Sequence, residues 1–372
     1  MGVLPLAHRH NYTAGAKGVK GVPVYLIVFE AGCRLTIALP AVIAISNMRQ
    51  IMRRSILPSA VSFIVLFGIV SVNHAAEKIR MSVSGSYNMI FLAAGVAQHK
   101  GFFKDEGLDA DIVVMTAPAS LAALSNGDID YTLLTGSVIR AAIRGLPVRI
   151  VAGLMSSSAH VFLARPEIRT IKELSGKRIG LAGFGDATHV LARIILAKHG
   201  VDPDKDVQFI GLGSDSGRFT ALQQNLADMV VTSPPWDFEG KKLGYNILAR
   251  AYEHVNYPLA GLGVNQKSLQ TNRAQVKRVV KSLVRANRFM RDNREESVKI
   301  LIGWGKGKSE HAYAAYDSTV KIISPDGSIP DDGLKILIDQ AKRDVKVSRD
   351  VPVSEITDFS ILREVQKELG LR

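Results

Sequence analysis

The chain has 372 residues, of which 47% are hydrophobic, so it is long enough and apolar enough for two domains with cores of their own. Its formal net charge is +13, but no nucleic-acid-binding motif accompanies this surplus, so no nucleic-acid partner is predicted. The single cysteine, Cys33, lies near the N-terminus. A disulfide framework, a thiol nucleophile and a cysteine-ligated metal are therefore excluded from the rest of the chain.

Residues 52–76 have the layout of a secretory signal peptide, with Arg53-Arg54 before an uncharged apolar run and small residues after it. Twin-arginine export is a second interpretation of the arginine pair. A membrane anchor is the alternative, but the run over residues 56–72 is short and contains a proline and a glycine.

Residues 1–51 fit neither a signal peptide nor an anchor, because charges and prolines interrupt their apolar stretch. We therefore expect translation to start at Met52 or Met48. The upstream residues are interpreted as a non-native extension.

The body begins with a β/α half over residues 77–168, which we assign to a first lobe. Alternating residues predict a strand over 78–85, and helical spacing predicts a helix from Met89 that ends at Gly101. Further strands are expected in the segments ADIVVM, DYTLLT, VRIVAGLM and HVFLAR. The crossing to a second lobe is placed near Pro166.

Residues 169–258 are assigned to the second lobe, in which the strands KRIGLAG, VQFIGL and ADMVVT alternate with helices. This β-α-β-α-β order is typical of a parallel sheet, where ligands lie beyond the carboxyl ends of the strands. Small polar residues occupy those ends in both halves. The strand LAGLGVN is expected to rejoin the first lobe, which then also contains residues 259–372.

Helical spacing continues from Thr271 to the C-terminus. The first of these helices, over residues 272–290, has a Val/Leu face, and its opposite face carries Arg273, Lys277, Lys281, Arg285 and Arg288. We interpret this basic stripe as a solvated surface. Contact with an acidic partner is the alternative.

Catalytic patterns are missing from the sequence: no G-x-G-x-x-G, Walker A, H-E-x-x-H or G-x-S-x-G motif occurs. His160 and His189 stand alone, so no catalytic residue, metal or cofactor is predicted. Asp186 is a candidate general base, but its place before a helix favours an N-cap. Trp236 follows a strand end and is compatible either with core packing or with the wall of a ligand cleft.

Several stretches resemble the periplasmic substrate-binding proteins of ABC importers, in the nitrate/sulfonate/taurine and NMT1/THI5-like group. They are KIRMSVSGSYN, FLAAGVAQHKGFFKDEGLDADIV, ALSNGDIDYTLLTGS, IKELSGKRIGLAGFGDATHVLARIILAKHGVD and ALQQNLADMVVTSPPW. The resemblance covers roughly residues 78–369. It implies an α/β fold of type II-like architecture, with two lobes and a ligand cleft between them. The chain departs from the group's pattern before the Pro-Trp pair, where it has Ser233-Pro234 instead of an acidic residue.

The resemblance implies a monomeric periplasmic protein that captures a small, anionic organic molecule and delivers it to ABC permease subunits, without being an enzyme. An enzyme on the same fold is an alternative, either a pyrimidine-precursor synthase or a chorismate-derived menaquinone-pathway enzyme. A ligand-binding module for a sensor is another. From the strand ends and helix starts, the expected ligand-binding residues are Ser84, Ser86, Tyr87, Asn88, Thr135, Gly136, Ser137, Ser156, Gly183, Gly185, Asp186, Thr188, Ser233 and Trp236.

Overall fold

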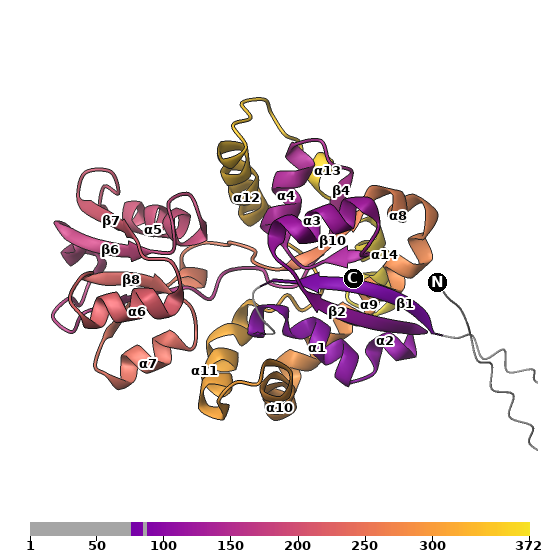
Figure 1. Cartoon of the computed structure of the whole chain (residues 1–372), viewed down its shortest axis with the longest axis horizontal. Coiled ribbons are helices and arrows are strands. Elements are labelled where there is room, and N and C mark those ends of the chain that lie inside the picture. Colours follow the sequence, from indigo (N-terminus) through magenta and orange to yellow (C-terminus); the bar gives the residue numbers. More distant parts are fainter. Residues whose placement is uncertain (1–75, 85–87) are drawn as a thin grey trace, which may run out of the picture. The chain divides into compact units, whose positions relative to one another are not determined.

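The computed structural model describes residues 76–84 and 88–372, which belong to one compact unit of the chain (Figure 1). The predicted extension and the predicted signal peptide, apart from Ala76, lie outside the described residues. Within the described part, no helix is both long enough and apolar enough to cross a bilayer. Over residues 76–84 and 88–372 the strands form two five-stranded sheets, and the fold is the expected α/β architecture.

The first sheet, with its helices, forms lobe I and has the strand order β2-β1-β3-β10-β4. β1 runs parallel to β2 and β3, whereas β10 lies antiparallel between β3 and β4. The predicted return of LAGLGVN to the first lobe is therefore confirmed. The strands are β1 (Glu77–Val83), β2 (Leu108–Val114), β3 (Tyr131–Thr132), β4 (Val148–Gly153) and β10 (Gly261–Asn265).

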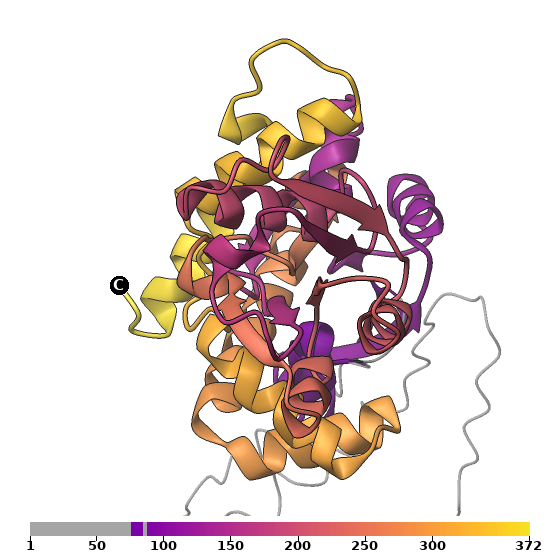
Figure 2. The same cartoon turned by 90° about the vertical axis from the view of Figure 1, so that its left-hand side faces the viewer.

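The second sheet is the centre of lobe II and faces the viewer in Figure 2. Its strand order is β7-β6-β8-β5-β9, with β6 parallel to β7 and β8, and with β5 antiparallel to β8 and β9. The strands are β5 (Val161–Ala164), β6 (Lys177–Leu181), β7 (Val207–Gly211), β8 (Met229–Thr232) and β9 (Asn246–Arg250).

The assignment of the strand HVFLAR to lobe I is wrong. This strand is β5, and it pairs with β8 and β9 of lobe II. All four of its residues are buried, so the strand satisfies the burial requirement of either sheet and its pattern does not discriminate between them. The crossing between lobes consequently lies before β5, over residues 154–160, and not near Pro166.

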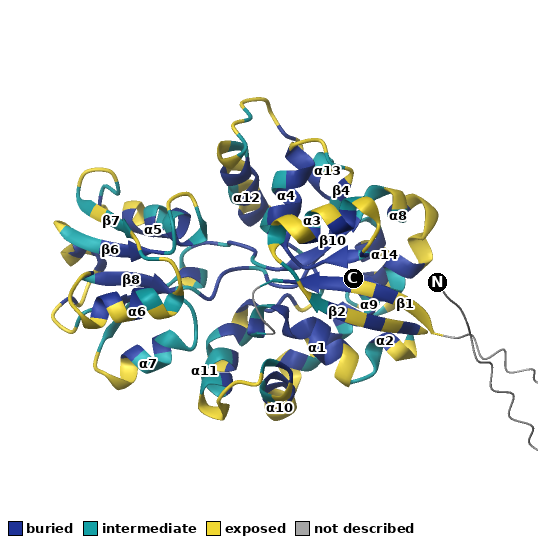
Figure 3. Cartoon of the chain, in the orientation of Figure 1, coloured by how far each residue is buried: buried dark blue, intermediate teal, exposed yellow. Residues whose placement is uncertain are grey.

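Helices cover both sheets with their buried faces inward (Figure 3). One core joins β1 and β2 to helices of lobe I, and a second core begins beneath α4 and continues into lobe II. The α-helices are α1 (Leu92–His99), α2 (Phe102–Asp105), α3 (Ala117–Asn126), α4 (Thr135–Ile143), α5 (Ala187–Lys198), α6 (Asp215–Gln223), α7 (Trp236–Lys242), α8 (Gln266–Thr271), α9 (Arg273–Asp292), α10 (Arg294–Gly305), α11 (Ser309–Thr319), α12 (Asp331–Asp344), α13 (Val353–Ile356) and α14 (Ser360–Glu368). Short 3-10 helices lie at Met89–Phe91, Ile171–Leu174, Ala251–Glu253 and Val320–Ile322.

The basic stripe on α9 is ion-paired within lobe I. Lys277 lies 2.5 Å from Glu368, and Arg285 lies 2.8 Å from Asp105. Lys281 likewise lies 3.0 Å from Glu106. Most residues of the stripe thus form ion pairs that join α9 to α2 and α14. Because their charges are already neutralised within the chain, an acidic partner at this face is disfavoured.

Candidate functional site

Two segments of the chain cross between the lobes, and they are hydrogen-bonded to one another. The N–H groups of Leu154 and Met155 donate to the carbonyl of Ala260 at 2.9 and 3.0 Å. Further along, the N–H of Ala251 donates to the carbonyl of His160 at 2.8 Å. The loops at the strand ends of both lobes lie around these paired crossings.

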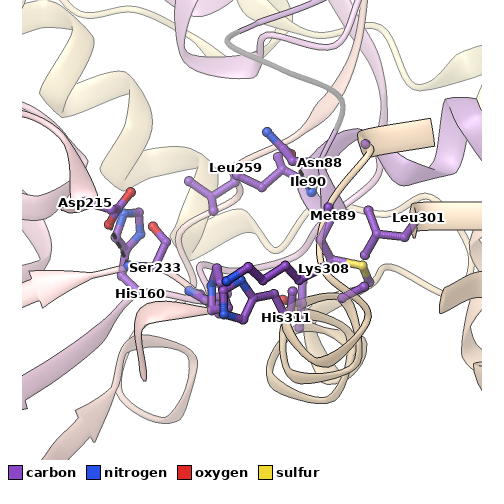
Figure 4. A pocket seen from close by; sticks show the side chains of 18 residues that line it. Asn88, Met89, Ile90, His160, Asp215, Ser233, Leu259, Leu301, Lys308 and His311 are labelled. Carbon is purple, nitrogen blue, oxygen red and sulfur yellow. Dashed lines mark hydrogen bonds between the residues drawn. The ribbon is translucent and has the colours of Figure 1, made fainter. Parts of the chain in front are cut away.

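A cavity of about 360 Å³ lies beside the crossings, and we call it the His160 pocket (Figure 4). Its walls are largely apolar and include Met89, Leu259, Leu301 and Ala312. His160, Asp215 and Ser233 of the lobe II side lie opposite Met89 and Leu301 in Figure 4. The polar lining residues are Asn88, His160, Asp215, Ser233, Lys308, His311 and Thr319.

Asp215 organises the lobe II side of the His160 pocket. Its Oδ1 accepts hydrogen bonds at 2.8 Å from the Thr232 hydroxyl and from the Ser233 N–H, and a further one from the Arg218 guanidinium. Arg218 is 2% exposed and also donates to the carbonyl of Gly213. The buried guanidinium therefore offsets the Asp215 charge and fixes the loop that ends β8.

His160 is held by the serine two residues before it. Its Nδ1 lies 2.6 Å from the hydroxyl of Ser158, which also accepts a hydrogen bond from the His160 backbone N–H at 3.3 Å. Removal from water lowers the pKa of His160 below its ordinary value, although the nearby Asp215 carboxylate opposes this effect. His160 is accordingly uncharged at neutral pH.

Helix α11 of lobe I supplies the opposite polar wall. Lys308 occupies the N-cap position of α11 without a side-chain capping hydrogen bond and lines the pocket, and among the described residues no carboxylate lies within ion-pair distance of its Nζ. His311 lies one turn further along and contacts Glu239 of α7 at 2.8 Å. Lys308 thus leaves one positive charge available to a solute in this pocket.

The contact between α7 and α11 also gathers possible metal ligands. Ligand atoms of Glu239, Glu310 and His311 all lie within 4.8 Å of one another. Lys242, however, lies 2.8 Å from Glu310 and 3.6 Å from Glu239. A lysine among the carboxylates makes this group an ion-pair network that links the two lobes.

A second cavity, of about 500 Å³, shares Leu259 with the first, and we call it the Arg140 pocket. Arg140 lies 3.4 Å from Asp344 and donates to the Ser137 hydroxyl at 3.3 Å. The fully buried Thr135 hydroxyl has no hydrogen-bond partner within the described structure. This pocket therefore offers polar groups with unused hydrogen-bonding capacity.

The start of α5 is already occupied by an anion of the protein itself. Asp186 Oδ1 accepts hydrogen bonds from the His189 N–H at 3.1 Å and from the Thr188 hydroxyl at 2.6 Å. The predicted N-cap role of Asp186 is confirmed. The Thr188 hydroxyl also accepts from the Ala182 N–H at 2.9 Å, so its proton and one lone pair are engaged within the chain, and its expected role toward a ligand stays a prediction.

The other expected ligand residues divide between the two pockets. Asn88 and Ser233 line the His160 pocket, and Thr135, Gly136, Ser137, Gly185 and Asp186 line the Arg140 pocket. Neither pocket is lined by Ser84, Ser156, Gly183 or Trp236, and Ser86 and Tyr87 lie outside the described residues. The Ser156 hydroxyl instead donates to the carbonyl of Ile322 at 3.2 Å.

Among the lining residues that sequence reasoning missed are His160, Asp215, Lys308, His311 and Arg140. A signal existed for Asp215 and Arg140, because Asp215 begins α6 directly after the polar loop that follows β7, and Arg140 lies one helical turn beyond Ser137. Lys308 and His311 carried no such signal, since α11 follows long after the strands that it faces.

Trp236 packs within lobe II, with its ring centroid 5.0 Å from that of Phe219. It is half-buried, so Trp236→Ala is expected to lower the free energy of unfolding by about 2 kcal/mol, less than for a fully buried tryptophan. Solute affinity is expected to stay unchanged. Urea denaturation and calorimetry of the variant check both values. A loss of affinity without loss of stability would instead place Trp236 in the cleft.

The sequence profile of the NMT1/THI5 like family matches residues 88–297, more than half of the chain. The chain belongs to this family. A Bacillus subtilis (strain 168) protein named "Putative binding protein YtlA" is 22% identical over 64% of this chain and 74% of its own length. The match to the NMT1/THI5 like profile includes strand-end loops that line both pockets.

Solved structures that are similar to this chain have the two-lobed fold of periplasmic binding proteins. The periplasmic aliphatic sulphonate binding protein SsuA from Escherichia coli superposes with a TM-score of 0.63 at 18% identity, over 76% of this chain and 92% of that one. The desulfurization enzyme DSZB superposes with a TM-score of 0.60 at 14% identity, over 79% of this chain and 99% of that one. The fold is therefore confirmed, and it supports both binding proteins and an enzyme.

Proposed function

We propose that this NMT1/THI5-like chain is an extracytoplasmic solute-binding protein. It captures a small organic anion, such as a sulfonate or a carboxylate, and delivers it to an ABC permease. The observation that carries the proposal is the His160 pocket, a cavity of about 360 Å³ with apolar walls, which Lys308 lines with a positive charge that no carboxylate of the described residues approaches within ion-pair distance. Such a cavity suits a solute with an apolar body and one anionic group.

The balance of charge around the His160 pocket supports an anion. Asp215 also lines it, but the buried Arg218 guanidinium offsets that carboxylate. The Lys308 charge remains, beside the N-terminus of α11, where helix backbone N–H groups also favour an anion. The binding of a sulfonate by the SsuA neighbour is consistent with this class of solute.

Capture between lobes is supported by the contacts on both sides of the cleft. Lys242 of α7 lies 2.8 Å from Glu310 of α11, and Gln340 of α12 donates to the carbonyl of Gly185 at 2.7 Å. Such contacts hold the lobes together over a bound solute, and separating them opens the cleft around the crossings. One chain provides both walls, so the protein is proposed to act as a monomer.

A binding role is favoured over catalysis by the chemistry of the pocket. His160, Asp215 and His311 are the lining groups suited to acid–base work, and no nucleophile activated by any of them is found among the described lining residues. An enzyme of the DSZB type is the second candidate, because it shares the fold. Turnover of a bound sulfinate or sulfonate would decide for it. A protein that delivers the solute to a sensor would use the same pocket and would differ only in its protein partner.

The proposal predicts that Lys308→Gln weakens binding of a sulfonate or carboxylate by about fivefold. The loss is modest because Lys308 is exposed and its interaction with an anion is screened by water. A thermal-shift screen of the body, residues 77–372, against sulfonates, nitrate, aromatic acids, pyrimidines and amino acids identifies the probe, and calorimetry then measures the affinity.

Lys335→Gln is the matched control, because Lys335 lies exposed on α12 and outside both pockets. It removes the same charge and is expected to leave the affinity unchanged. The proposal fails if the screen yields only cationic solutes, or if both variants bind the anion as tightly as the parent.

A further inference from the structure

The lobe II end of the His160 pocket carries two polar atoms whose hydrogen-bonding capacity the described chain does not use. Asp215 accepts all of its hydrogen bonds through Oδ1, and no donor among the described residues reaches Oδ2. The contacts of His160 run through Nδ1, and none of the described residues bonds Nε2. Both side chains line the cavity, so both atoms are open to a solute.

The hydrogen bonds of Ser158 decide which His160 nitrogen carries the proton. The Ser158 hydroxyl accepts from the His160 backbone N–H, and Nδ1 is its one acceptor among the described residues. If Nδ1 were protonated, the hydroxyl proton of this fully buried serine would have no acceptor there. Ser158 therefore donates to Nδ1, and the neutral ring presents an Nε2–H donor to the cavity.

The pocket thus presents a donor and an acceptor of little net charge. Arg218 offsets Asp215, and its guanidinium is held by Gly213 and Asp215 in a buried position. A bound ammonium group would meet a carboxylate that is already paired. A neutral polar group would instead meet the His160 Nε2–H and the Asp215 Oδ2, neither of which has a hydrogen-bond partner among the described residues.

We propose that His160 and Asp215 recognise a solute group in which a hydrogen-bond acceptor lies next to a donor. A primary carboxamide has this arrangement. The inference rests on the proposed function, because it assumes that the cavity admits a solute. It adds that the solute carries an uncharged polar edge at the lobe II end, in addition to an anionic group at the Lys308 end.

Four probes test the inference by calorimetry: benzenesulfonate, 4-carbamoylbenzenesulfonate, 4-(aminomethyl)benzenesulfonate and benzamide. The parent is expected to bind 4-carbamoylbenzenesulfonate about tenfold more tightly than benzenesulfonate. Asp215→Asn keeps the shape and the Oδ1 acceptor but turns Oδ2 into a donor, and His160→Phe removes the Nε2–H. Each variant is expected to abolish the tenfold preference, measured as the ratio of the two affinities within that variant, while Asp331→Asn, on an exposed position of α12, preserves the preference.

The outcomes separate this inference from the proposed function. Equal binding of benzenesulfonate and its carbamoyl derivative overturns the inference and leaves anion capture standing. Tighter binding of the aminomethyl probe also overturns it, because it would show that Asp215 selects a cation. If no sulfonate binds but benzamide binds in a manner that Asp215→Asn abolishes, the inference holds and the anion proposal fails. If neither benzamide nor the carbamoyl probe binds, the inference is wrong.

Discussion

Phe162→Ala is expected to lower the free energy of unfolding by about 3–5 kcal/mol. Phe162 is 0% exposed and lies in β5, between β8 and β9 of lobe II. Alanine at this position removes most of an aromatic side chain from a core that also contains β6 and α5, and the strands around it cannot close the cavity. Urea denaturation followed by far-ultraviolet circular dichroism measures the change.

Phe184→Ala is the matched control, because Phe184 is 68% exposed. The same truncation there is expected to change stability by less than about 0.5 kcal/mol. A loss below about 1 kcal/mol for Phe162→Ala would contradict the central place of β5 in the second sheet.

Arg250→Ala is expected to cost about 3 kcal/mol, because it leaves the Asp237 carboxylate buried without a cation. Asp237 has a side chain that is 3% exposed, and its Oδ2 accepts hydrogen bonds from Arg250 at 3.0 Å and from Ser318 at 2.8 Å. Asp237 Oδ1 has no partner within the described structure. A neutral Ser318 hydroxyl alone does not replace the lost charge.

The double variant Arg250→Ala/Asp237→Asn provides the test of this cause. It removes the uncompensated charge, so it is expected to recover part of the lost stability relative to Arg250→Ala alone. Thermal and urea unfolding of the parent, both single variants and the double variant complete the cycle. If the double variant is no more stable than Arg250→Ala, the loss comes from packing of the arginine and not from a stranded carboxylate.

The hydrogen bond from Ser318 to Asp237 also connects the two lobes. Ser318 belongs to α11 of lobe I, whereas Asp237 and Arg250 belong to lobe II. The same carboxylate therefore stabilises lobe II internally and contacts the opposite wall of the cleft. A second contact between the same two helices joins His311 of α11 to Glu239 of α7.

Local sequence patterns were sufficient to predict the buried face of one helix and the ends of two others. The Val/Leu face of α9 is buried as expected, and Gly101 adopts the positive φ of 76° that follows the end of α1. Asp186 caps α5, as its place before a helix predicts. These features depend on side-chain periodicity and on hydrogen bonds between residues a few positions apart, so they can be read from the neighbouring residues.

Sequence by itself thus determined the α/β class, the two groups of strands, the return of β10 to lobe I and the polar strand ends. Tertiary structure decided that β5 belongs to lobe II, because an all-buried strand fits either sheet until its long-range pairing is formed. It also decided that Arg218 is buried against Asp215, and that Lys308 lines the cavity with no carboxylate of the described residues within ion-pair distance. The charge that a pocket offers depends on which ionised groups are already paired, and those pairs form between residues and helices that only folding brings together.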